Sequence, residues 1–216
     1  MPALAYTFKS FAQNRRLQWL LMVSVVLTFF IVTAVVVSAV WALQNTEFFK
    51  TGWLEGVADV IGGFAALLVG LILVPALMPL IAGLMEEPIL KALEAQMPEK
   101  QIPQGKQPFW GNIIEDLRFI AVVIVLNTLA LPLYFIPVLN FAVYYVLNGY
   151  LLGREFFTTV DGYYNGKKNA QKKFKAHQTK VFIYGVLLAF VAIIPLVGLF
   201  LPVFAITLMF YVRQKP

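Results

Sequence analysis

Four long apolar stretches alternate with short polar links along the chain. They cover residues 17–43, 57–85, 117–147 and 181–212. Each stretch exceeds the length of about 18 mostly apolar residues that is typical of a membrane segment. The pattern therefore predicts an all-α integral membrane protein that forms one membrane domain, residues 1–216.

The third and fourth stretches differ from the first two because each carries a pair of prolines near its midpoint. Pro132 and Pro137 lie in LPLYFIPVLN, and Pro195 and Pro202 lie in IPLVGLFLPV. Proline removes a backbone donor and clashes with the preceding helical turn, so we expect the chain to turn back at these places. Each leg would hold about 14 residues, or about 21 Å of helix, which is short of a hydrocarbon core of about 30 Å. The first two stretches are then long transmembrane helices, and the last two are membrane-dipping helical hairpins.

The basic residues favour the same arrangement. The chain has 17 Lys and Arg residues against 11 Asp and Glu residues, a net charge of +6. Cytoplasmic loops of membrane proteins carry an excess of Lys and Arg. Kinked single spans would place the basic link at 148–180 outside, whereas two returning hairpins leave only Lys50 outside. We therefore expect a multi-pass membrane protein with both termini in the cytoplasm.

The two proline-bearing stretches also resemble each other. At an offset of 63 residues, seven of 24 positions are identical, and Pro132 is aligned with Pro195. Apolar sequences often match by chance, but the aligned prolines favour an internal structural repeat, which is common among transporters.

Three shorter segments complete the expected organisation. Residues 3–16 place apolar side chains on one helical face and Lys9 on another, which indicates an interfacial amphipathic helix. Residues 88–97 are expected to form a short cytoplasmic helix with Pro88 at its first position. Residues 151–176 run from an apolar start into a lysine cluster, which is typical of a basic interfacial helix on anionic membrane lipids. Nucleic acid is not an expected partner, because no reading fold accompanies the lysines.

Composition argues against several kinds of chemistry. Hydrophobic residues make up 60% of the chain and charged residues 13%, which suits a membrane domain better than a soluble one. With no cysteine and one histidine, His177, neither a metal site nor a cofactor is expected. The chain has no GxxxxGK[ST] phosphate loop and no nucleophile with a matching base, so neither ATP hydrolysis nor another enzymatic activity is expected.

Several motifs resemble those of the CysZ-type sulfate permeases of bacterial inner membranes, which share a superfamily with the eukaryotic etoposide-induced membrane proteins. The motifs are NGYLLGREFF at 148–157, FIPVLN at 135–140, IPLVGLFLPV at 194–203 and MEEPILKALEAQMP at 85–98. The resemblance implies two long transmembrane helices, two membrane-dipping hairpins and a homo-oligomer. It also implies sulfate uptake for sulfur assimilation without nucleotide hydrolysis in the polypeptide.

The resemblance further implies an anion contact near the start of the first span, where the family has a glycine-leucine-arginine motif. This chain has Gln13, Asn14, Arg15 and Arg16 there, which keeps the arginines and lacks the glycine and leucine. Arginine forks fit an oxyanion well, so Asn14, Arg15, Arg16 and the more distant Arg154 are candidate anion-binding residues. The same arginines also fit plain positive-inside topology, and Arg154 also fits a local ion pair.

Two functions remain open at this point. The first is an inner-membrane anion permease or channel-like transporter for sulfate or a related oxyanion. Its route is expected to be passive, because Asp59 is the only acidic residue within the four apolar stretches. The second is a non-transport membrane scaffold or assembly factor, which the departure at Gln13 and Asn14 keeps open.

Overall fold

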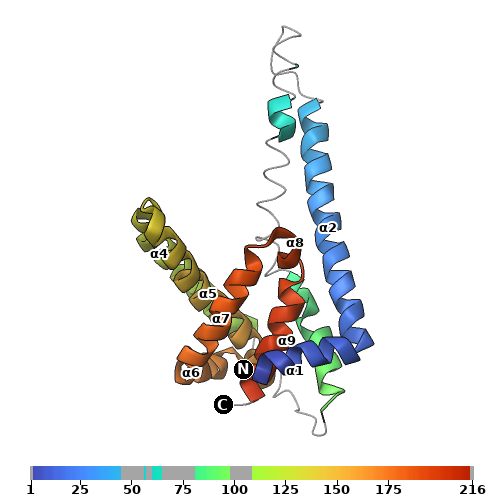
Figure 1. Ribbon diagram of the computed structural model, residues 1–216, viewed down its shortest axis with the longest axis vertical. Helices are drawn as coiled ribbons and strands as arrows, with labels where there is room; N and C mark the ends of the chain where they lie inside the picture. Colours follow the sequence, from blue (N-terminus) through green and yellow to red (C-terminus); the bar gives the residue numbers. More distant parts are fainter. Residues whose placement is uncertain (1, 45–55, 57–59, 65–80, 98–108, 215–216) are drawn as a thin grey trace.

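The computed structural model describes residues 2–44, 56, 60–64, 81–97 and 109–214, and its named elements are all α-helices. They are α1 (Pro2–Gln13), α2 (Arg15–Gln44), α4 (Phe109–Tyr134), α5 (Pro137–Asn165), α6 (Lys167–Ala176), α7 (Gln178–Ala192), α8 (Pro195–Gly198) and α9 (Leu201–Gln214). A further helix covers residues 81–94. Both chain termini lie at the end of the molecule that holds α1 and α6, and α2 extends away from that end (Figure 1).

Helix α9 forms the centre of the fold. Its residues from Leu201 to Val212 are buried, apart from the half-buried Phe204. It packs against α1, α2, α5 and α7. Tyr211 stacks on Tyr6 of α1 with ring centroids 5.7 Å apart, and its hydroxyl hydrogen-bonds to Ser10. The carboxyl-terminal helix is thereby fastened to the amino-terminal one.

Helices α2 and α4 are apolar but largely uncovered by the rest of the chain. Arg15–Ala42 and Leu117–Tyr134 are long enough to cross a membrane, with mean hydropathies of 2.9 and 2.0. Large side chains such as Phe29, Phe30 and Leu129 are more than 60% exposed. The core helix of a soluble protein would bury such side chains, so these exposed helices are typical of a membrane protein.

The chain reverses direction between α4 and α5 at residues 135–136. Ile136 has an extended backbone, with φ −100° and ψ 109°, and Pro137 is the first residue of α5. Proline forces the preceding residue out of the helical region and suits the first helical position, which explains both features. The Arg154 guanidinium lies 4.9 Å from the ring centroid of Phe119, so α4 and α5 run antiparallel from this turn.

The turn between α7 and α8 repeats that geometry. Ile194 is extended, with φ −85° and ψ 108°, and Pro195 begins α8. In both turns the isoleucine amide donates to the carbonyl three residues earlier, at 3.2 Å for Ile136 and 3.3 Å for Ile194. The structure therefore aligns Pro137 with Pro195, whereas the sequence comparison aligned Pro132 with Pro195.

The other two prolines expected in the turns lie within helices. Pro132 is inside α4, two residues before the helix ends, and Pro202 is the second residue of α9. Pro202 fits because the first turn of a helix needs no amide donors. Pro132 removes one hydrogen bond, and α4 continues for less than a turn beyond it.

Each leg of the two hairpins was expected to have about 14 residues. The legs of the second hairpin have about that length, and the legs of the first hairpin are longer. Helices α7 and α9 have 15 and 14 residues, but α4 and α5 have 26 and 29. Helix α5 continues past residue 147 because Phe156, Phe157 and Tyr164 are buried in the core. The expected boundary near 147–151 is therefore absent, and the break falls at Gly166, whose φ of 80° favours glycine.

The helix over residues 81–94 joins two segments that were expected to be separate. Most of the predicted second span, 57–85, lies outside the described residues. Pro88 lies inside this helix and does not begin it. Ile81, Met85, Ile89 and Leu93 recur every four residues and are all buried, so one continuous face packs against the core.

Candidate functional site

Asn14 forms the junction between α1 and α2. Its Oδ1 accepts hydrogen bonds from the amides of Arg16 and Leu17, at 3.0 and 3.2 Å, which caps the start of α2. Its Nδ2 donates to the carbonyl oxygen of Ala92 at 2.9 Å. These contacts explain Asn14 as a structural residue that ties α2 to the helix over 81–94.

Arg15 and Arg16 follow this cap and are both exposed at the start of α2. Arg16 also lies near the helix over 81–94, because its positive charge lowers the pKa of Lys91. A stronger opposite effect comes from Glu87, whose carboxylate accepts a hydrogen bond from Lys91 at 2.6 Å and raises that pKa. The two arginines are therefore exposed at the start of α2, beside other charges.

Arg154 lies in a different place, at the base of the α4–α5 pair. It lines a cavity of about 80 Å³ together with Phe119, Glu155, Thr158, Thr159, Lys167 and Gln171. Phe119 covers the guanidinium, and Lys167 brings a second positive charge from the first position of α6. Three helices thus surround a small polar space that contains two cations and one carboxylate.

Glu86 connects this cavity to the helix over 81–94. The carboxyl is mostly buried, and burial raises its pKa from 4.5 to about 7. The Lys167 ammonium opposes this effect, while the neighbouring Glu87 adds to it. A carboxyl with such a pKa exchanges its proton near neutral pH. The apolar pattern of the sequence did not identify Glu86 as a buried carboxyl.

The helix over 81–94 therefore interacts electrostatically with Arg16 of α2 and with Lys167 of α6. A strip of charges along this helix consists of Arg16, Lys91, Glu87, Glu86 and Lys167. At one end of the strip the charge of Arg16 lowers the pKa of Lys91, and at the other end the charge of Lys167 lowers the pKa of Glu86. Within the described residues, no group of three His, Cys, Asp or Glu side chains could hold a metal ion. The cations of the strip are arginine and lysine side chains, which can contact an anion, and Glu86 and Glu87 lie among them.

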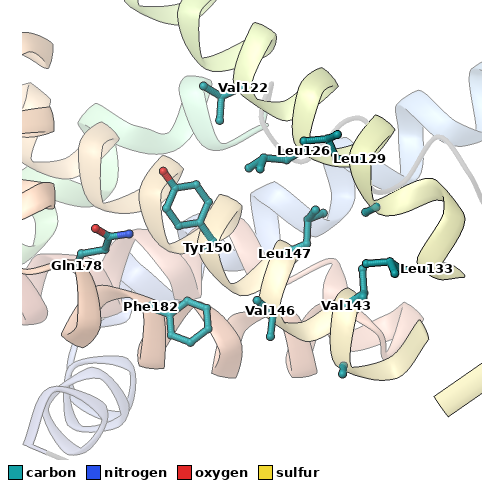
Figure 2. A pocket seen from close by; sticks show the side chains of 12 residues that line it. Val122, Leu126, Leu129, Leu133, Val143, Val146, Leu147, Tyr150, Gln178 and Phe182 are labelled. Carbon is teal, nitrogen blue, oxygen red and sulfur yellow. The ribbon is translucent and has the colours of Figure 1, made fainter. Parts of the chain in front are cut away.

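A larger cavity of about 680 Å³ lies between α4, α5 and α7 (Figure 2). Tyr150 and Gln178 lie at one end, and Leu133 and Val143 lie at the other. None of the described residues that line it is charged. Taking a dianion out of water is costly without charged partners, so this space does not suit sulfate.

Comparison with protein families identifies the chain. A sequence model of the family described as sulfate transporter CysZ/etoposide-induced protein 2.4 matches residues 3–202. The chain belongs to this family. Membership in the CysZ/etoposide-induced protein 2.4 family confirms the resemblance found in the motifs, and it indicates a membrane protein with a sulfate-transporter-like function. Comparisons with curated proteins and with solved structures find no match to the chain.

One charged cluster in this member of the CysZ/etoposide-induced protein 2.4 family was not anticipated from its sequence. Asp161 of α5 is fully buried, and its Oδ1 accepts hydrogen bonds from Arg213 at 2.5 Å and Lys173 at 3.2 Å. Asn165 also donates to it, at 2.9 Å. The cluster joins α5, α6 and α9 at the end where the chain terminates. The sequence feature that could have indicated this buried charge is a single aspartate between apolar and aromatic residues, in VDGYY.

Tyr164 extends this cluster toward the helix over 81–94. The Arg213 guanidinium lies 4.1 Å from the centroid of the Tyr164 ring. Burial raises the pKa of Tyr164, and the nearby Glu94 carboxylate adds to the increase. The tyrosine thus stays neutral in the physiological range. Asp161 and Arg213 neutralise each other, so this site is suited to holding helices together.

Proposed function

We propose that the protein is an inner-membrane anion permease that admits sulfate, or a related oxyanion, for sulfur assimilation. The observation that carries the proposal is the family match over residues 3–202. The strip of charges from Arg16 to Lys167, along the helix over 81–94, supports it. Arg16, Lys91 and Lys167 are cations on this strip that attract a dianion, and Glu86 and Glu87 on the same helix reduce that attraction.

The proposed topology places α1, α6 and both chain termini in the cytoplasm. Two features of the fold support it. Both termini lie at the end that holds α1 and α6 (Figure 1). The α8 turn lies beside α2, because Val197 and Phe200 share a cavity with Leu21 and Met22 of α2. Helix α2 therefore continues well beyond the turn, as expected if the α7–α9 hairpin enters only part of the bilayer.

The α4–α5 pair also returns to the side from which it enters, although α4 is long enough to cross. In a bilayer, polar backbone groups at the two turns must be covered by protein or reach water. The exposed apolar faces of α2 and α4 must meet lipid or another copy of the chain. We therefore propose a homo-oligomer in which neighbouring copies cover the turns and enclose the anion route.

Arg15 and Arg16 are proposed to attract the anion at the cytoplasmic mouth. Asn14 is assigned the structural role described above, since its amide is engaged in the cap and with Ala92. No acidic relay crosses the apolar stretches, so we expect the anion to follow its gradient without coupled ATP hydrolysis.

Uptake of radiolabelled sulfate into vesicles reconstituted with the purified protein tests this function. We expect uptake that unlabelled sulfate inhibits more strongly than chloride does. The Arg15→Ala, Arg16→Ala double variant should reduce uptake, whereas Lys9→Ala, which removes an exposed charge from α1, should not. Absence of flux with the wild-type protein, together with co-purification of a partner, would support the scaffold function and overturn the permease.

A further inference from the structure

The small polar cavity at the base of the α4–α5 pair has the composition of an anion site. Its two cations come from different helices, Arg154 from α5 and Lys167 from α6. The volume of about 80 Å³ corresponds to about three water molecules at about 30 Å³ each. Sulfate is a single compact ion of five heavy atoms, so the space is of the right order for one tetrahedral oxyanion.

The guanidinium of Arg154 is oriented by packing. Phe119 of α4 lies against it, with 4.9 Å between the guanidinium carbon and the ring centroid. A guanidinium that stacks on an aromatic ring keeps its N–H groups at the edge, where they can donate in pairs to an oxyanion. Stacking also reduces the conformational freedom that the side chain would lose when it binds a ligand.

Two threonines on α5 line the same cavity but differ in their hydrogen bonds. The Thr158 hydroxyl donates to the carbonyl oxygens of Arg154 and Glu155, at 2.8 and 3.1 Å, so its proton is used within the helix. The Thr159 hydroxyl makes no hydrogen bond to any described residue. Thr159 can therefore donate its proton to a ligand in the cavity.

Lys167 contributes both its ammonium group and the start of a helix. Helix α6 has ten residues and begins at Lys167, and its cap residue Gly166 offers no side-chain hydrogen bond. The first amides of such a helix carry partial positive charge, which adds to the attraction of an anion. Because Arg154 and Lys167 already supply two full charges, the helix end is a supporting feature here.

We propose that this cavity binds a tetrahedral oxyanion, with Arg154, Lys167 and Thr159 as its donors. The proposal rests on the permease function proposed above and assigns that function a binding site beyond the exposed arginines of α2. Glu155 lines the same cavity and Glu86 interacts with Lys167, so both carboxyl groups oppose the anion when they are ionised. These carboxyl groups therefore favour weak, reversible binding, which suits an anion that must leave again.

Equilibrium binding of radiolabelled sulfate to the purified full-length protein tests the site. Arg154→Gln and Lys167→Gln should each weaken sulfate binding by about tenfold or more, and Thr159→Val by less. Lys168→Gln is the matched control, because Lys168 is the next residue of α6 and is exposed. It should bind sulfate like the wild type. Thermal unfolding of each variant identifies misfolded protein, and Lys167→Gln gives a second test if Arg154→Gln fails to fold.

Vesicle uptake by the same variants separates failure of the site from failure of the function. If wild-type vesicles take up sulfate but Arg154→Gln and Lys167→Gln both bind sulfate normally, the site is wrong and the permease stands. Equal weakening by Lys168→Gln would also overturn the site, because a general charge effect would then explain the loss. If wild-type protein neither binds nor transports sulfate, the permease function itself fails.

Discussion

Gly185 of α7 lies directly against Gly149 of α5, so that a Cβ on Gly185 would overlap the carbonyl oxygen of Gly149. Gly153, one turn further along α5, makes a similar approach, and a Cβ there would lie 2.8 Å from the Val181 carbonyl oxygen. Small residues four positions apart allow helix backbones to come this close within a membrane. The NGYLLG part of the family motif thus has a packing explanation.

Substitution of Gly185 should destabilise the protein more than an ordinary glycine substitution does. Gly185→Ala inserts a methyl group against backbone, which cannot move aside as a flexible side chain can. We expect a loss of about 1–3 kcal/mol in the free energy of unfolding. Gly83→Ala is the control, because Gly83 also lies in a helix and has nothing within 4 Å of the added Cβ. Thermal unfolding in detergent compares the two, and equal stability of both variants would contradict the close contact.

Within the described residues, the apolar pattern predicted where helices occur but not where they end. Prolines alone do not determine a turn: Pro137 begins a helix, whereas Pro132 is accommodated inside one. The end of α5 depends on tertiary burial of Phe157 and Tyr164, which no local propensity reveals. The repeat was predicted, but its alignment was not, because chance matches among apolar residues favoured Pro132 over Pro137.

The buried Asp161 should be essential for stability. Asp161→Asn leaves the Arg213 guanidinium, whose side chain is 9% exposed, without its nearest negative charge. Breaking a buried ion pair from one side costs about 3–5 kcal/mol. Glu87→Gln breaks the exposed pair with Lys91, and it should cause no measurable loss. Unfolding by denaturant measures both variants, and similar behaviour of the two would show that the Asp161 cluster does not stabilise the fold.

The candidate site was only partly predictable, because three of its features depend on contacts between distant segments. Arg154 was identified from its motif, but the proximity of Lys167 arises from the break at Gly166. Asp161 meets Arg213 across 52 positions of sequence. The sequence offered no way to see that Asn14 contacts Ala92 and serves as a cap.

Glu86 should make the stability of the protein depend on pH. Its pKa rises from 4.5 to about 7 on folding, so the folded chain holds the proton more tightly. The stabilising contribution is therefore complete below about pH 4.5 and is lost as the pH rises through about 7. Lys167, Glu87 and Tyr163 are the charged or titratable groups coupled to it. Glu86→Gln should flatten the unfolding temperature between pH 5 and 8.

Glu87→Gln provides the control for the pH experiment, because Glu87 is the exposed neighbour of Glu86 on the same helix. Its pH profile should keep the wild-type transition, shifted toward lower pH, because Glu87 adds to the increase in the pKa of Glu86. A wild-type profile that is already flat, or one that Glu86→Gln leaves unchanged, would show that Glu86 does not titrate in this range.

Replacement of Asn14 should affect stability through the cap. Asn14→Ala removes the acceptor for the amides of Arg16 and Leu17 and the donor to Ala92, and we expect a loss of about 1 kcal/mol. Asn14→Ser restores an acceptor and should recover part of the loss. If both variants keep wild-type stability but lose sulfate binding, Asn14 contacts the anion and the structural assignment fails.

The account depends most on one feature of the topology. The α4–α5 pair and the α7–α9 pair must each enter and leave the membrane on the same side. Because the chain has no cysteine, single cysteines can be introduced and labelled from either side of sealed vesicles. Lys9 on α1 and Lys172 on α6 are both exposed and are suitable positions for such probes. The account predicts that an impermeant reagent labels both positions from the cytoplasmic face. A probe at Lys50 should be labelled from the opposite face. Labelling of Lys9 and Lys172 from opposite faces would contradict the proposed topology and the anion route built on it.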